Sequence, residues 1–275
     1  MANSPQRILP YRRFRQCATL YVMTKSSRDM WLAGVDGCKS GWLAVLVRPN
    51  GEDVRVLDVF MNFSDLLTGP DAPAIIAVDI PIGLPRESEL RGRGPERVVR
   101  PQIRPRSSSV FRIPSRRAVY AGIDKRIPDD SERYAHAREI ARSTSIDKKA
   151  FAKQGFYLFP KIVQVDKLLR QRKELIGRVF ETHPEVAFWR LNDEQGVSSS
   201  KHQKAGLKIR RELLMKARLP KTVVECDPPK GAKPDDLLDA LACAVVARRI
   251  YGRTAKHFPD QPSLDEFGLP MAIWA

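Results

Sequence analysis

Apolar segments of strand length, separated by glycine turns, open the folded part of the sequence. Gly37 and Gly41 lie in the first turn and can supply the positive φ that a sharp reversal needs. The third segment alternates apolar and polar residues, and a short helix capped by Asn62 or Ser64 is predicted behind it. The fourth segment is continuously apolar, as is typical of a strand covered on both faces. The four predicted strands are residues 31–35, 42–47, 54–60 and 74–78.

Prolines interrupt this pattern between Pro81 and Pro114. Because proline lacks a backbone N–H and blocks helices, we expect this stretch to be irregular. Farther along, apolar residues recur at helical spacing, and the last such segment combines a first-turn proline with terminal arginines. The later predicted elements are a helix over 131–141 capped by Ser131, a helix over 160–176, a strand over 178–182, a short helix reaching Leu191, and helices over 201–217 and 234–251.

The order of these elements predicts the sheet. Three consecutive strands joined by tight turns form an antiparallel meander, whereas the two later strands need helical crossovers and therefore join in parallel. The sequence thus predicts an α/β fold with a mixed five-stranded sheet flanked by helices, in which residues 80–175 form a helical, arginine-rich insertion between strands 4 and 5. We expect one domain over 31–255, a C-terminal tail over 256–275, and a basic N-terminal extension over 1–30 that is disordered, a transit segment or the product of an over-long gene model.

Composition narrows the class of protein. The chain has 275 residues of which 43% are hydrophobic, enough to bury one full core, and no apolar run approaches the roughly 18 residues that span a bilayer. The four cysteines form no C-x-x-C pair and the four histidines are scattered, which argues against structural zinc or a disulfide framework and favours the cytoplasm. Lysine and arginine number 48 against 32 acids, a formal charge of +16. This excess favours a polyanion such as nucleic acid as partner, unless the whole proteome is arginine-rich.

Four aspartates mark a candidate metal site. Asp36 lies in the glycine turn after the first strand, and Asp79 closes the fourth strand at the sheet edge where α/β proteins place ligands. Asp236 and Asp239 share one helix face, and the small residues around Asp239 predict that it is partly buried and in need of a cation. The alternatives are a turn residue for Asp36, a cap or ion pair for Asp79, and a helix cap for the acids that open the last helix, a role we assign to Asp235.

Two glutamates could complete this site. Glu181 ends the fifth predicted strand and Glu185 opens the next helix, with His183 between them to orient either carboxylate. An acid in a first helical turn is also expected from the helix dipole, and a histidine before proline can be structural. Oxygen ligands select hard cations, so the cofactor we predict is Mg²⁺ or Mn²⁺, as one or two ions. Neither a P-loop nor a dinucleotide-binding glycine motif occurs.

Several short motifs occur in an order that resembles one protein family. They are Gly34-Val-Asp-Gly-Cys-Lys-Ser-Gly-Trp42, Val78-Asp-Ile-Pro-Ile-Gly-Leu-Pro85, Ser108-Ser-Val-Phe111, Glu181-Thr-His-Pro-Glu185 and Asp235-Asp-Leu-Leu-Asp-Ala240, with Gln154 and Ser200-Lys201 as further matches. Across about residues 31–255 they resemble the domain-of-unknown-function 429 family, described as predicted RNase H-like nucleases. The resemblance implies an RNase H-like fold whose site is built from acids, with Asp36 and Asp79 on strands and an Asp236/Asp239 pair similar to the last-helix carboxylates of RuvC-type resolvases.

The function expected from residues and resemblance together is metal-dependent cleavage of nucleic acid. The candidate catalytic residues are Asp36, Asp79, Glu181, Glu185, Asp236 and Asp239, of which the four aspartates would ligate metal. The candidate nucleic-acid-binding residues are Lys39, Arg86, Arg91, Arg93, Arg112, Lys161 and Lys201. Two other functions stay open: an ATP-dependent phosphotransferase or ATPase, in which the turn over 36–41 would meet phosphates, and a non-catalytic nucleic-acid-binding protein. The choice between DNA and RNA and the oligomeric state are also open.

Overall fold

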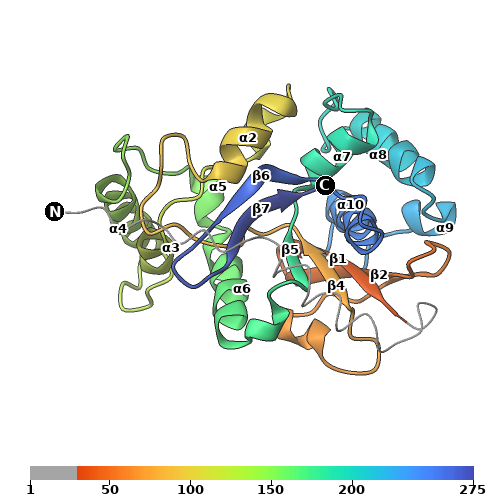
Figure 1. The fold of residues 1–275 in the computed structure, drawn as a ribbon, viewed down its shortest axis with the longest axis horizontal. Coiled ribbons are helices and arrows are strands. Elements are labelled where there is room, and N and C mark those ends of the chain that lie inside the picture. The colour runs from red at the N-terminus through yellow and green to blue at the C-terminus, as the bar shows by residue number, and fades with distance from the viewer. Residues whose placement is uncertain (1–29) are drawn as a thin grey trace.

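A mixed five-stranded sheet forms the centre of the computed structural model, which describes residues 30–275 (Figure 1). The strand order is β3-β2-β1-β4-β5. The first three strands are antiparallel neighbours, whereas β4 adds to β1 and β5 adds to β4 in parallel. The predicted meander and the predicted mixed sheet are therefore confirmed. The strands are β1 (Leu32–Cys38), β2 (Gly41–Val47), β3 (Val54–Val56), β4 (Ile75–Val78) and β5 (Val179–Glu181).

Two local predictions in the meander are wrong. Gly41 takes a positive φ of 147°, but Gly37 lies inside β1 and does not. The missing side chain of Gly37 makes room for Lys161, whose Cδ would lie 2.6 Å from a Cβ at this position. The third strand ends at Val56 and does not continue to Phe60, because only an isolated bridge joins Phe60 to β2.

One face of the sheet packs against α10 (Pro234–Tyr251), which has the predicted bounds. A Cβ on Gly34 would lie 2.0 Å from the backbone nitrogen of Ala244, so helix and sheet approach each other through their backbones. The alanines of α10 permit this approach, as the sequence predicts. The close packing places the first two turns of α10 beside the ends of β1 and β4, where the predicted acids lie.

Helices from the segment between β4 and β5 cover the opposite face. Val35 and Trp42 of the sheet share one apolar cluster with Phe159 and Ile162 of α6, and residues of α3 and α4 extend it. Figure 1 shows α3 and α4 beside α6, away from α10. The helices besides α10 are α2 (Gly94–Gln102), α3 (Arg116–Ala121), α4 (Asp130–Ser143), α5 (Lys153–Phe156), α6 (Phe159–Gln171), α7 (Pro184–Leu191), α8 (Lys204–Lys216) and α9 (Lys221–Val224), with 3-10 helices η1 (Phe63–Leu67), η2 (Ser107–Ser109) and η3 (Lys173–Leu175).

The proline-rich stretch is more regular than its composition predicts. It contains α2, with Pro95 in the first turn, where no hydrogen-bonded N–H is lost, and Pro101 in the last turn. Farther along, α4 begins slightly before the predicted helix. Its cap is Asp129 and not Ser131, because the carboxylate of Asp129 accepts from the backbone N–H of Ser131 (2.9 Å).

Residues 256–275, predicted as a tail, form an antiparallel hairpin of β6 (His257–Leu264) and β7 (Pro270–Trp274). A bridge between Thr182 and Trp274 joins this hairpin to the chain after β5, and the hairpin shares an apolar cluster with α2 and α7. The predicted N-terminal extension falls on residues 1–29, outside the described part of the chain, except for Met30, which is buried. Within residues 30–275, no helix is both long and apolar enough to cross a membrane.

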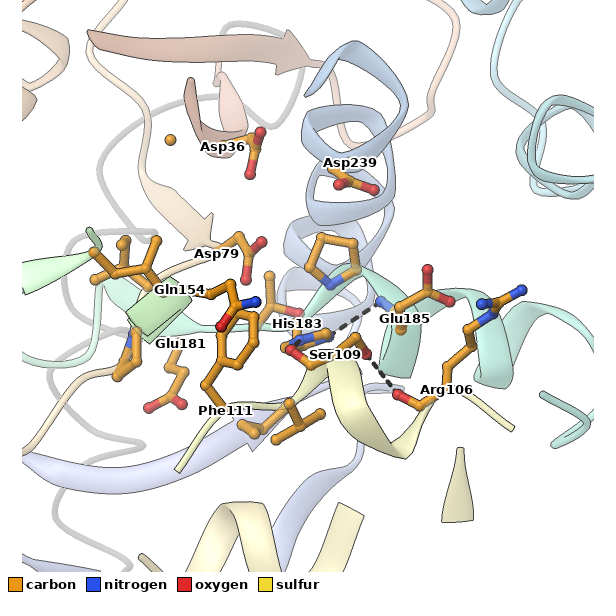
Figure 2. A pocket seen from close by; sticks show the side chains of 18 of the residues that line it. Asp36, Asp79, Arg106, Ser109, Phe111, Gln154, Glu181, His183, Glu185 and Asp239 are labelled. Carbon is orange, nitrogen blue, oxygen red and sulfur yellow. Dashed lines mark hydrogen bonds between the residues drawn. The ribbon is translucent and has the colours of Figure 1, made fainter. Parts of the chain in front are cut away.

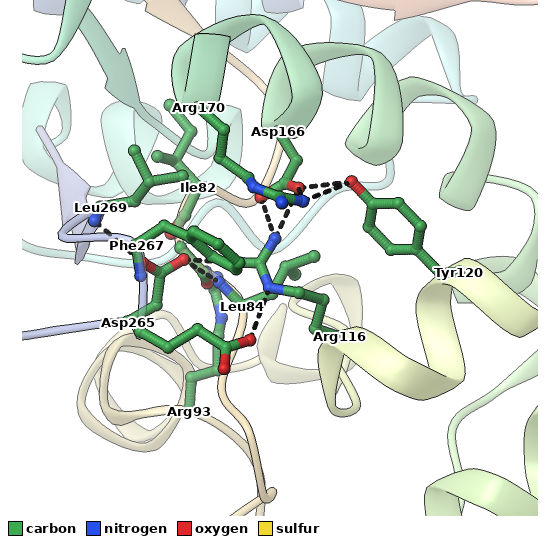
Figure 3. Close-up of polar contacts among 12 residues, drawn as sticks. Ile82, Leu84, Arg93, Arg116, Tyr120, Asp166, Arg170, Asp265, Phe267 and Leu269 are labelled. Atoms are coloured by element: carbon green, nitrogen blue, oxygen red, sulfur yellow. Dashed lines mark hydrogen bonds and ion pairs between the residues drawn. The ribbon is translucent and has the colours of Figure 1, made fainter. Parts of the chain in front are cut away.

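A buried ion-pair network ties the hairpin to the helical side of the molecule (Figure 3). Arg116 of α3 donates to Asp166 of α6 (Nη1–Oδ1 2.5 Å) and to Asp265 after β6 (Nη2–Oδ2 2.5 Å). Asp265 also accepts from the backbone N–H groups of Leu84 and Leu269, at 3.1 and 2.9 Å. Because buried charges are tolerated only when they are paired and hydrogen-bonded, this network fixes the path of the chain that leaves β4.

Candidate carboxylate site

A pocket of about 590 Å³ opens where the carboxyl ends of β1, β4 and β5 meet the start of α10. Segments far apart in the sequence line it, including the chain after β4, η2, α5 and the first turn of α7. Figure 2 shows acids from the strands and from α10 around this pocket. The structure thus brings together all six predicted catalytic acids, which are Asp36, Asp79, Glu181, Glu185, Asp236 and Asp239.

Strand alternation explains why Asp36 and Asp79 lie on the α10 side of the sheet. Side chains two residues apart share a face, so Asp36 follows Gly34, and Asp79 follows Ala77, toward α10. The two aspartates are neighbours because β1 and β4 pair in register at Val35 and Val78. The backbone N–H of Asp79 donates to the carbonyl of Val35 (2.9 Å), which extends this pairing to the aspartate.

Asp239 approaches the same point from the second turn of α10. Its side chain is only 2% exposed, which confirms the predicted burial, and its Oδ2 lies 2.5 Å from the Nζ of Lys201. Its other oxygen, Oδ1, is buried with no hydrogen-bond partner among the described residues. A buried carboxylate oxygen without a donor is costly, so this atom marks a place where a cation or a donor from a ligand fits.

Asp236 has a different local role from Asp239. Its Oδ2 accepts from the backbone N–H of Lys233 (2.8 Å), so it caps α10, and the residue is half-buried. Asp235, which we expected to be the cap, instead lies 3.9 Å from the Nζ of Lys201 and 3.6 Å from His202. Asp236 therefore lies at the rim of the acid cluster formed by Asp36, Asp79 and Asp239 and already has a partner.

Burial dominates the electrostatics of this acid cluster. It raises the pKa of Asp36 well above its ordinary range, and repulsion from Asp239 and Asp79 adds to the effect. Burial also raises the pKa of Asp239 to about 7, although Lys201 opposes it. For Lys201 itself, burial would lower the pKa, but attraction to Asp239 outweighs burial and raises it. One ammonium therefore faces three carboxylates, and the cluster has room for more positive charge.

Asp36→Asn is expected to stabilise the metal-free protein at pH 8 and not at pH 4. Folding raises the pKa of Asp36, so the folded protein binds a proton there more tightly than the unfolded chain does. This proton binding contributes fully to stability below the ordinary pKa of an aspartate, about 3.9, and the contribution is lost as the pH rises through the folded-state pKa. We expect a Tm gain of roughly 2–4 °C at pH 8, corresponding to about 1 kcal/mol. Melting curves in EDTA at both pH values test this; an equal change at both would contradict it.

Two predicted catalytic residues, Glu181 and Glu185, are paired with arginines. Glu181 is buried and accepts from Arg93 (Nη2–Oε1 2.6 Å), while burial raises its pKa to about 7 against the opposing effect of Arg93. Glu185 is also buried and accepts from Arg210 (Nη2–Oε1 2.5 Å). These pairings account for the burial of both glutamates without a metal, and their role in completing a metal site stays a prediction.

His183 fixes the backbone beside the pocket. It is the N-cap of α7, where its Nδ1 accepts from the backbone N–H of Glu185 at 3.2 Å. Its Nε2 lies 3.3 Å from the carbonyl oxygen of Ser109 in η2 (Figure 2). A neutral ring that accepts at Nδ1 carries its proton on Nε2 and can donate it to Ser109, so His183 links α7 to η2.

The predicted nucleic-acid-binding residues fall into two groups. Lys39, Arg86 and Arg91 are exposed, and Arg112 and Lys161 are half-buried. Arg93 is 2% exposed and engaged with Glu96, Glu181 and two backbone carbonyls, which favours a role in the fold. Lys201 faces the acids of the pocket. Sequence reasoning missed these pairings because residues that become partners lie 38 and 88 positions apart.

The residues of the acid cluster suit a hard cation in their chemistry. Carboxylate oxygens are the ligands that Mg²⁺ and Mn²⁺ prefer, and Asp239 offers an unpartnered buried oxygen. In this conformation, no three His, Cys, Asp or Glu side chains of residues 30–275 converge closely enough to hold a metal ion. Lys201 contacts the other oxygen of Asp239, Oδ2. The donor set fits a metal in its chemistry, and the acids would have to come closer together to hold one.

A comparison with protein families gives a match that covers most of the chain. The model of the family described as "Protein of unknown function (DUF429)" matches residues 34–264, which include all six candidate acids. The match extends past residue 255 into β6. Neither the curated proteins nor the solved structures that were compared gave a match.

Proposed function

The chain belongs to the family described as "Protein of unknown function (DUF429)", a description that assigns no activity, and we propose that this protein is a metal-dependent hydrolase of phosphodiester bonds in nucleic acid. The proposal includes an RNase H-like fold in which residues 80–175 are an insertion between β4 and β5. One observation carries it: Asp36, Asp79 and Asp239 come from three elements to one buried cluster, where a carboxylate oxygen lacks a partner.

The three carboxylates of the acid cluster would hold Mg²⁺ or Mn²⁺, and Asp236 at the rim would contact it or its water. When bound, such a metal activates water and stabilises the charge that develops on a phosphodiester. Asp36 and Asp79 are fixed by strand pairing and Asp239 by the packing of α10, so the chain presents its ligands on rigid elements. Lys201 offsets part of their charge through its contact with Asp239.

Charge outside the pocket suits a nucleic-acid substrate. The chain carries a formal +16, and the exposed Lys39, Arg86 and Arg91 are free to meet phosphates. Binding through such contacts releases counterions, so affinity for an oligonucleotide should fall steeply between 50 and 200 mM salt. A weak salt dependence would argue for a small-molecule substrate.

The proposed function is tested with purified protein and labelled DNA and RNA oligonucleotides, single-stranded, duplex and hybrid. We expect cleavage with Mn²⁺ or Mg²⁺ and none with EDTA. Mn²⁺ should also raise the Tm, because an ion that binds only the folded state stabilises it. Absence of cleavage of every substrate together with an unchanged Tm in Mn²⁺ would refute the proposal. A Tm response to ATP with Mg²⁺ and none to oligonucleotides would favour the phosphotransferase alternative.

A further inference from the structure

The side of the pocket that faces the acid cluster carries an aromatic and an amide side chain. It is formed by residues 106–111, which we call the wall segment, and by Gln154 of α5. Figure 2 shows Phe111 and Gln154 together, on the side of the pocket opposite Asp36 and Asp239. The pocket therefore combines an acidic side with a side that carries an aromatic ring and an amide.

The wall segment is held firmly in place. Arg106 donates from Nε to the carbonyl oxygen of Val197 (3.0 Å), and Ser109 contacts Nε2 of His183 through its carbonyl oxygen. Next to it, a Cβ on Gly196 would lie 1.9 Å from the carbonyl oxygen of Arg104, so the two backbones are in direct contact. These contacts join the wall segment to α7 and to the loop before Lys201, and it closes the pocket on that side.

Phe111 and Gln154 have few partners of their own. Phe111 is half-buried, yet it belongs to none of the apolar clusters of residues 30–275 and pairs with no other described aromatic ring. Gln154 makes no side-chain hydrogen bond within the described chain. An aromatic face and an amide, both unengaged and on one pocket side, are the groups that proteins use to stack a base and to read its edge.

The size and closure of the pocket decide which form of nucleic acid can use these groups. A base in a duplex is stacked and paired inside the helix, so it reaches a pocket only after it has left the stack. A volume of about 590 Å³, closed on one side by the wall segment, admits an unpaired nucleotide but not a double helix. A single-stranded segment meets the requirement without the cost of unpairing.

We propose that this site takes an unpaired nucleotide of a single strand, with its base on Phe111 and Gln154 and its phosphodiester at the acid cluster. The contact of the phosphodiester with the acid cluster rests on the proposed function. The contact of the base rests on the geometry of Phe111 and Gln154. The inference names the substrate class as single-stranded nucleic acid or the frayed end of a strand. Phe111 and Gln154 would contact the base and orient the strand, and neither belongs to the acids that would hold the metal.

The test compares the binding of a labelled single strand and of a blunt duplex of the same sequence, by fluorescence anisotropy with Ca²⁺ in place of Mn²⁺. The wild type should bind the single strand at least roughly 10-fold more tightly, and Phe111→Ala should weaken that binding by roughly 5- to 150-fold, as for the loss of one stacked base. Phe111→Trp should retain it. Tyr157→Ala is the matched control, because this ring on the same α5 region is 63% exposed.

The outcomes separate this inference from the proposed function. Equal binding and cleavage of duplex and single strand would overturn the inference and leave the hydrolase standing. Phe111-dependent binding of the single strand, with no cleavage of any substrate and an unchanged Tm in Mn²⁺, would support the inference and refute the hydrolase. If free mononucleotides compete as strongly as the strand does, the inference that the ligand is a single strand is overturned. If Phe111→Ala does not fold, Phe111→Leu retains a large apolar side chain and removes the ring, and wild-type binding by Phe111→Leu would overturn the inference.

Discussion

Asp239→Asn is expected to lower metal-dependent cleavage of nucleic acid by about 100-fold or more. The substitution keeps the shape of the side chain and removes the charge from a carboxylate that is 2% exposed and carries an unpartnered oxygen. A metal supplies several kcal/mol of transition-state stabilisation, and about 1.4 kcal/mol corresponds to a factor of ten in rate. Loss of one ligand from a cluster of three therefore removes most of the rate. Initial rates with saturating Mn²⁺ measure the effect.

A matched control separates the loss of this ligand from a general loss of negative charge. Asp260→Asn removes the same charge from an exposed position on β6, outside the pocket, and should leave the rate unchanged. The Tm of metal-free Asp239→Asn should stay near that of the wild type, because the asparagine oxygen can still accept from Lys201. In Mn²⁺ the wild type should gain Tm and the variant should gain much less. Equal rates for Asp239→Asn and Asp260→Asn would remove Asp239 from the site.

Arg93→Met is expected to destabilise the fold by about 3–5 kcal/mol, the usual effect of removing one partner of a buried ion pair. Arg93 is 2% exposed and donates to Glu96, to Glu181 and to the carbonyl oxygens of Ile82 and Gly83. Methionine leaves two buried carboxylates and two carbonyls without these donors, and their desolvation is then uncompensated. Chemical denaturation with guanidinium chloride measures the free energy of unfolding.

Arg97→Met is the control for this prediction. Arg97 lies on the same helix, α2, and pairs with Glu89 at the surface, where ion pairs contribute about 0–1 kcal/mol. The double change Arg93→Met with Glu181→Gln should recover part of the loss, because it removes one of the stranded charges. If Arg93→Met cannot be obtained folded, Arg93→Lys, which keeps the charge and loses the planar fork, supplies a measurable value. A loss no larger than that of Arg97→Met would contradict the structural role of Arg93.

The local pattern of the chain was enough to predict the elements that bury a regular apolar face. The first two strands of the meander, the buried β4 and the helix α10 follow from apolar patterning, glycine turns and helical spacing, because these signals act within a few residues. The same reasoning failed for α2, where proline occupies a first turn, and for the hairpin of residues 256–275, whose strands gain from packing against α2 and α7. Both elements depend on contacts that the local pattern does not contain.

The candidate site also depends partly on local sequence and partly on tertiary contacts. The sequence marked three acids as candidates: Asp36 and Asp79 because they lie at the ends of predicted strands, and Asp239 because it lies among small, apolar residues on the last helix. Only the tertiary structure decided which charges face one another. In the folded chain, Glu181 pairs with Arg93 and Glu185 pairs with Arg210. Lys201 contacts Asp239, and the wall segment lines the pocket. Such pairings join residues far apart in the chain, and their free energy exists only once packing has removed water from both partners.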